Sequence, residues 1–107
     1  MAEEITIARP YAEAVFRLAK ERNTLSAWSD MLKVISETIS VGQIQALVSN
    51  PSVSADKLSE IILEICGDKL NSEGKNLVAL LIENDRIEVL PQLSDLYEQL
   101  KAQYEGI

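Results

Sequence analysis

The stretch that decides the fold is residues 5–22, ITIARPYAEAVFRLAKER. Its apolar residues recur at helical spacing instead of alternating as they would along a strand. On a helical wheel they form two stripes: one holds Ile5, Ala8, Ala12, Val15, Phe16 and Ala19, and the other holds Ile7, Tyr11, Ala14 and Leu18. Together the stripes cover an arc of roughly 200°, about twice what a surface helix needs to face a core. The segment is therefore predicted to be a helix that is covered on more than one side.

Helical periodicity continues along the rest of the chain, and no segment shows a sustained strand pattern. The further predicted helices are one that carries Trp28 to Ile39 and four at about 43–49, 55–66, 72–84 and 88–105. Their connections are short, which favours antiparallel neighbours. We therefore predict an all-α fold, a compact six-helix bundle that forms a single domain over residues 1–107.

Several residues are typical of helix ends. Pro10 is expected near a first turn, where its missing N–H is least harmful. Thr24, Ser54 and Asn71 are candidate N-caps, because their side chains can accept a bond from a free backbone N–H. Gly67 is expected to stop the helix that precedes it.

The segment Leu77–Ile82 is an unbroken apolar hexapeptide, LVALLI, and as a helix it would be apolar around most of its circumference. Two explanations fit the surplus of apolar surface on the first and fifth predicted helices. Either both helices are central and buried on several sides, or part of their apolar surface forms a groove for a partner helix. Both can hold at once. Trp28 is interpreted as a core residue. Tyr11 is interpreted either as a residue at the edge of the core or as a binding residue.

The charge balance excludes some partners. The chain carries seventeen acidic and ten basic residues, a formal net charge of -7. It has no basic cluster for phosphate neutralisation, which argues against nucleic acid and against an anionic membrane surface. No apolar stretch approaches the roughly 20 residues that cross a bilayer, and the acidic start is not a secretory signal.

The residues for chemistry are largely missing. The chain has no histidine and one cysteine, Cys66, so there is no histidine base, no His-based nucleophile pair and no cysteine-rich zinc site. We expect no catalytic residue, cofactor or metal, although a small acidic enzyme or carboxylate metal protein remains a rival. Cys66 lies in an apolar run and is interpreted as a buried hydrophobic residue in a reducing compartment.

Three motifs carry a family resemblance. They are ITIARPYAEAVF at residues 5–16, Asn50-Pro51, and Asn76-Leu77 through Leu80 to Asn84-Asp85-Arg86. Together they resemble the N-terminal part of the delta subunit of bacterial and chloroplast ATP synthase, whose mitochondrial counterpart is the oligomycin-sensitivity-conferring protein. The resemblance covers nearly the whole chain. Members of that family are longer, so the C-terminal stalk-contacting domain is expected to be absent here.

The resemblance implies a non-catalytic stator component that is monomeric in isolation. It implies a groove between the first and fifth helices that receives the amphipathic N-terminal helix of an alpha subunit. By position, the candidate partner-binding residues are Ile7, Tyr11, Ala14, Leu18, Asn76, Ala79, Leu80 and Glu83. In the full-length protein the b-subunit peripheral stalk is a further partner, and the complex lies at the cytoplasmic face of the bacterial inner membrane. The alternative function is a generic helical adaptor or a homodimerising interaction domain.

Overall fold

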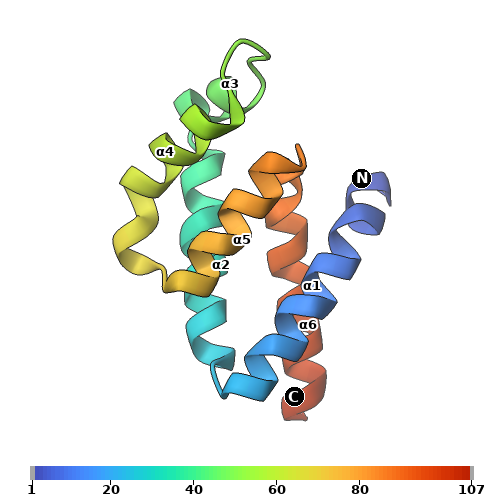
Figure 1. Cartoon of the computed structure of the whole chain (residues 1–107). Coiled ribbons are helices and arrows are strands. Elements are labelled where there is room, and N and C mark those ends of the chain that lie inside the picture. The colour runs from blue at the N-terminus through green and yellow to red at the C-terminus, as the bar shows by residue number, and fades with distance from the viewer. Residues whose placement is uncertain (1, 107) are drawn as a thin grey trace. The chain divides into compact units, whose positions relative to one another are not determined.

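Helix α1 spans Ala2–Arg22 in the computed structural model, which describes residues 2–106 (Figure 1). It begins earlier than predicted, with Glu3 and Glu4 in its first turn, where negative charge favours a helix N-terminus. Pro10 consequently lies inside the helix and not in its first turn, so that expectation was wrong. Pro10 has no N–H to donate to the carbonyl of residue 6, but its ring lies on the exposed side, where helical periodicity is maintained around it.

Helix α2, Leu25–Ser40, follows after a tight turn. Asn23 adopts a left-handed conformation (φ 57°), which asparagine tolerates better than most residues. The expected cap by the Thr24 side chain was wrong, because its hydroxyl is buried and makes no hydrogen bond. The backbone makes the junction instead: the Thr24 N–H donates to the Ala19 carbonyl (2.9 Å), and the Thr24 carbonyl accepts from the Trp28 N–H (3.0 Å).

The remaining elements are helical as well. They are α3 (Gly42–Val48), α4 (Ala55–Cys66), the 3₁₀ turn η1 (Gly67–Lys69), α5 (Ser72–Glu83), the 3₁₀ turn η2 (Ile87–Val89) and α6 (Leu90–Glu105). The all-α class is confirmed, with six α-helices and no strand among residues 2–106. The last helix begins at Leu90 and not at residue 88, because the chain first completes a 3₁₀ turn.

Two of the predicted caps are confirmed. The Ser54 hydroxyl accepts from the Lys57 N–H (3.1 Å), and the Asn71 side chain accepts from the Gly74 N–H (2.8 Å). Gly67 does end α4, but its backbone is right-handed (φ -60°) and leads directly into η1. A left-handed glycine ends α6 instead, at Gly106 (φ 79°).

The chain forms two compact units, joined through α2. The first contains the residues up to Lys33 and those from Val89 onward, and the second is Val34–Glu88. The buried apolar side chains of the first unit are Ala8, Ala12, Val15, Ala19, Trp28, Met31, Leu32, Val89, Leu90, Leu93, Leu96 and Tyr97. Those of the second unit are Ile35, Ile39, Ile44, Leu58, Ile62, Cys66, Leu70, Leu77, Val78, Leu81, Ile82 and Ile87.

Within the first unit, α1 and α6 run side by side in the same direction (Figure 1). The Phe16 ring meets the rings of Tyr97 and Tyr104 edge-on, at centroid distances of 6.3 and 5.8 Å. Tyr97 is fully buried, and its hydroxyl donates to the Leu25 carbonyl (2.6 Å), which ties α6 to the start of α2. Trp28 is confirmed as a core residue, with 1% of its surface exposed.

Within the second unit, α4 and α5 pack against each other as a helical hairpin joined by η1. Cys66 lies at the end of α4 and is buried, as predicted, with its thiol bonded to the Ile62 carbonyl (3.2 Å). Burial raises the pKa of the Cys66 thiol above its ordinary value, although a hydrogen bond with Thr38 opposes the shift. The thiol is therefore protonated at neutral pH, as expected of a packing residue.

Candidate functional site

The two stripes of α1 have different surroundings. The stripe that begins at Ile5 supplies the buried face, on which Ala8, Ala12 and Ala19 have no exposed surface, although Ile5 itself is 40% exposed. Residues this small allow another helix to approach closely, and α6 packs along α1. The stripe predicted to bind a partner is only partly covered: Ile7, Tyr11 and Leu18 are half-buried, and Ala14 is exposed.

Helix α5 shows the same division. Its buried face consists of Leu77, Val78, Leu81 and Ile82, together with Gly74. Of the predicted binding residues, Ala79 is half-buried, while Asn76, Leu80 and Glu83 are exposed. Leu80 is 47% exposed, which is unusual for a leucine in the middle of a helix.

The eight predicted site residues therefore form two separate sets, one on α1 and one on α5. Each set lies on the less buried side of its helix, in its own unit of the structure. The groove that would join the two sets stays a prediction.

The motif residues after α5 have a structural role that explains their spacing. Asn84 is the C-cap of α5, where its N–H donates to the Leu80 carbonyl (3.0 Å). Asp85 is left-handed (φ 58°), and the Arg86 N–H then returns to the Leu81 carbonyl (2.7 Å). These bonds satisfy carbonyls that a helix end leaves without partners, so Asn84-Asp85-Arg86 fixes where α5 stops.

A mixed polar and apolar hollow of about 410 Å³ lies beside the C-terminal end of α5. Glu83 and Asp85 line it together with Ile82, and Asn50 and Pro51 line it from the loop after α3. The Asn50 side chain accepts from the Ser52 N–H (2.9 Å), a local turn that holds this loop in shape. Two of the resemblance motifs, Asn50-Pro51 and the end of α5, thus border the same hollow.

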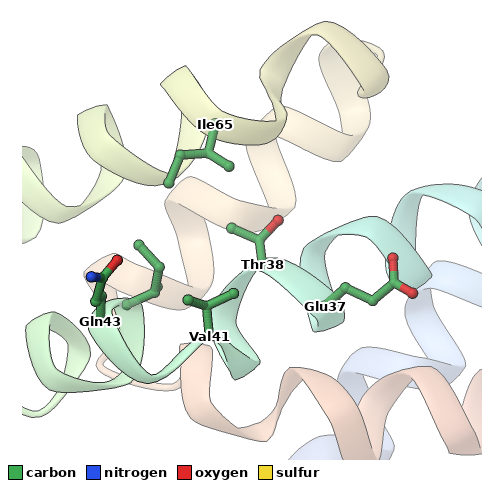
Figure 2. Close-up of a pocket in the computed structure, with 6 residues that line it drawn as sticks. Glu37, Thr38, Val41, Gln43 and Ile65 are labelled. Atoms are coloured by element: carbon green, nitrogen blue, oxygen red, sulfur yellow. The ribbon is translucent and has the colours of Figure 1, made fainter.

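A second hollow, of about 380 Å³ and almost wholly apolar, lies between the end of α2, α3 and α4 (Figure 2). Its lining residues are Glu37, Thr38, Val41, Gln43, Ile44 and Ile65. Val41 is 50% exposed and Ile65 is 55% exposed. Sequence reasoning missed both residues. The available signal was the run Ile61-Ile62-Leu63 followed by Ile65, which holds more apolar residues than one helix face can bury.

Residues 2–106 contain neither a cluster of metal ligands nor a helix that could span a membrane. Among residues 2–106, no three cysteine, aspartate or glutamate side chains gather closely enough to hold a metal ion. Over the same residues, every helix is too short or too polar to cross a bilayer. The described residues thus form an all-helical protein whose uncovered apolar side chains gather on helix faces and in one hollow.

Known proteins identify the family of this chain. A family model described as "ATP synthase delta (OSCP) subunit" matches residues 7–107. The ATP synthase subunit delta of Nitrosomonas eutropha is 57% identical over 107 residues, and that of Nitrosomonas europaea is 56% identical. The protein of the same name from Nitrosospira multiformis is 50% identical. The chain belongs to the ATP synthase delta (OSCP) subunit family.

The matches cover 100% of this chain but 60% of the length of each of these three relatives. The chain thus corresponds to part of a family member, and the family model matches it almost from end to end.

Proposed function

We propose that this chain is a non-catalytic stator-binding domain of an F-type ATP synthase. It binds the amphipathic N-terminal helix of an alpha subunit in an apolar groove between α1 and α5. In the full-length protein it links the catalytic head to the b-subunit peripheral stalk at the cytoplasmic face of the bacterial inner membrane. The observation that carries the proposal is the uncovered apolar stripe of α1 in a member of this family.

The stripe has the chemistry that an amphipathic helix needs. Ile7, Tyr11 and Leu18 recur at the spacing of one helix face, and they are only half-buried. Leu80 on α5 supplies a further exposed aliphatic side chain. A partner helix with its own apolar stripe would remove this surface from water, at roughly 25 cal/mol for each Å² buried. Binding of this kind resists torque by burial and packing and requires no bond chemistry.

The test is a calorimetric titration of the 107-residue chain with a peptide of the alpha-subunit N-terminus. We expect one-to-one binding, and we expect Ala14→Glu to weaken it by at least about tenfold, since a charge would enter the apolar contact. Ala14 is exposed and glutamate is a good helix former, so this variant keeps the fold. Tyr11→Asp tests the neighbouring position, with its folding checked by circular dichroism.

The matched control is Ala27→Glu, which makes the same change at an exposed alanine of α2 outside the predicted groove. It should bind the peptide like the unmodified chain. Equal peptide affinities of the unmodified chain, Ala14→Glu and Ala27→Glu would contradict binding in the groove. If the peptide failed to bind and the free chain sedimented as a dimer that Ala14→Glu dissociates, the homodimerising alternative would replace the proposal.

A further inference from the structure

The hollow in the second unit is lined mainly by apolar surface. The Thr38 hydroxyl donates to the Val34 carbonyl (2.9 Å), so the side chain that faces the hollow has its donor satisfied (Figure 2). Ile44 also lines the hollow and is buried, whereas Val41 and Ile65 are about half exposed and lie on opposite sides of it (Figure 2). At about 380 Å³ the hollow falls within the roughly 300–1,000 Å³ range of ligand-binding pockets.

Val41 departs from a local sequence rule. It is the N-cap of α3, with extended backbone (φ -66°, ψ 132°), and no side-chain bond caps the helix. Serine, threonine, aspartate or asparagine at such a position stabilises a helix by about 0.5–2 kcal/mol relative to an aliphatic residue. The valine gives up that stabilisation and leaves half of its side chain in water. Local rules that are broken without a gain in packing are typical of functional positions.

The charges around the hollow indicate the kind of partner. Glu37 is the one charged residue in the lining, and it makes no ion pair among residues 2–106. The second unit contains nine acidic and four basic residues, so it carries a net charge of -5 of the -7 of the whole chain. This field repels a second copy of the chain and an anionic lipid surface, and it attracts a cationic segment.

We propose that this hollow binds a positively charged amphipathic peptide segment of a partner protein. Aliphatic side chains of the segment enter between Val41 and Ile65, and its lysine or arginine side chains face Glu37. The inference goes beyond the proposed function, because it concerns a different surface and stands or falls independently of the groove between α1 and α5.

The experiment uses the 107-residue chain and two synthetic helical peptides, one of leucine, alanine and lysine and one with glutamate in place of lysine. Binding is followed by residue-resolved NMR at low and physiological salt. We expect the lysine peptide to shift the amide signals of Val41, Ile44 and Ile65 in a saturable way. The glutamate peptide should leave them unchanged. Glu37→Gln should weaken binding and reduce its salt dependence, because one charge contact is lost.

The decisive variant is Val41→Ser. It should raise the melting temperature, because serine caps α3, and it should weaken lysine-peptide binding about tenfold or more, as expected when an apolar anchor is lost. Ile65→Gln should also weaken binding while keeping a helix-forming residue in α4. Ile5→Gln, at a 40% exposed isoleucine of α1 that is not among the predicted binding residues, is the matched control and should leave binding at the hollow unchanged.

Several results would overturn the proposal. One is a Val41→Ser protein that binds the lysine peptide as tightly as the unmodified chain. A second is a set of shifts that spread over the whole acidic surface without saturating, which indicates charge attraction alone. A third is a set of shifts confined to α1 and α5. This result would mean that the lysine peptide binds at the proposed alpha-subunit groove and not at the hollow. A dimer of the free chain that Val41→Ser dissociates would assign the hollow to a second copy.

Discussion

Helices α1 and α6 pack along each other in the same unit, yet they differ in what they leave uncovered. Four apolar side chains of α6 are buried, Leu90, Leu93, Leu96 and Tyr97, whereas Tyr104 in its last turn is largely exposed. Helix α1 buries one apolar stripe, rich in alanine, and keeps a second stripe partly in water. The comparison teaches that a helix can bind a partner when its apolar arc is wider than the part that neighbouring helices cover. A helix whose apolar arc is mostly covered has a structural role.

The largest expected effect is on the structural side of this comparison. Leu93→Ala removes a fully buried side chain of α6 and leaves a cavity. We expect a loss of about 2–5 kcal/mol in the free energy of unfolding, measured by urea denaturation. A loss below about 0.5 kcal/mol would break the comparison, because surface substitutions commonly reach that size.

The second effect concerns the buried stripe of α1. Ala12→Leu adds volume at a position with no exposed surface, where α1 packs closely. Overpacking of this kind should lower the free energy of unfolding by about 1–3 kcal/mol, again measured in urea. An unchanged stability would show that the alanines of α1 are not needed for close packing.

A smaller effect with a characteristic pH dependence is expected at Tyr97. Burial, together with Glu98 and Glu105, raises the pKa of the Tyr97 phenol well above its ordinary value. At neutral pH Tyr97→Phe should lose about 1 kcal/mol, the worth of the bond to the Leu25 carbonyl. Above about pH 10 the unfolded tyrosine ionises while the folded one keeps its proton, which lowers the free energy of unfolding of the unmodified chain. The phenylalanine variant has no phenol to ionise, so it does not show this loss.

The stability gap between the unmodified chain and Tyr97→Phe should therefore narrow as the pH rises above about 10. Urea denaturation at a series of pH values measures this gap. Tyr104→Phe is the matched control, because it makes the same substitution at a tyrosine that is 60% exposed. A difference in the free energy of unfolding that stays constant as the pH rises would contradict the raised pKa of the buried Tyr97 phenol.

The smallest effect on stability is expected for the stripe of α1 that stays uncovered. Ala14→Glu should change the free energy of unfolding by no more than about 0.5 kcal/mol, because the side chain is exposed and glutamate favours helices. Circular dichroism on heating suffices for the measurement. A loss comparable to that of Ala12→Leu would place Ala14 in the packed core and remove the difference between the two stripes.

Much of the fold was predictable because its signals are local. Six helices follow from periodicity, the bounds of α4 were predicted correctly, and Ser54 and Asn71 cap as expected. The errors arose where a local rule had to compete with its context. Pro10 was read as a helix start, although acidic residues before it continue the helix, and the Thr24 hydroxyl is buried and not available as a cap.

The candidate site was predictable only in part. Sequence identified two apolar stripes on α1, but deciding which one faces the core required knowing what packs on it. Tyr104 continues the apolar spacing of α6, yet it is largely exposed, with Lys20 Nζ 5.2 Å from its ring centroid. The hollow at Val41 and Ile65 could not be predicted, because residues 37–44 and Ile65, which are separate along the chain, create it together.

The central claim is that the uncovered stripe of α1 binds a partner helix. The most direct test is residue-resolved NMR of the 107-residue chain titrated with the N-terminal peptide of an alpha subunit. The account predicts saturable one-to-one shifts at the amides of Ile7, Tyr11, Ala14 and Leu18 and along the exposed side of α5, with the signals of Leu90 and Leu93 unchanged. A peptide that binds without moving the α1 signals, or that does not bind at all, would contradict it.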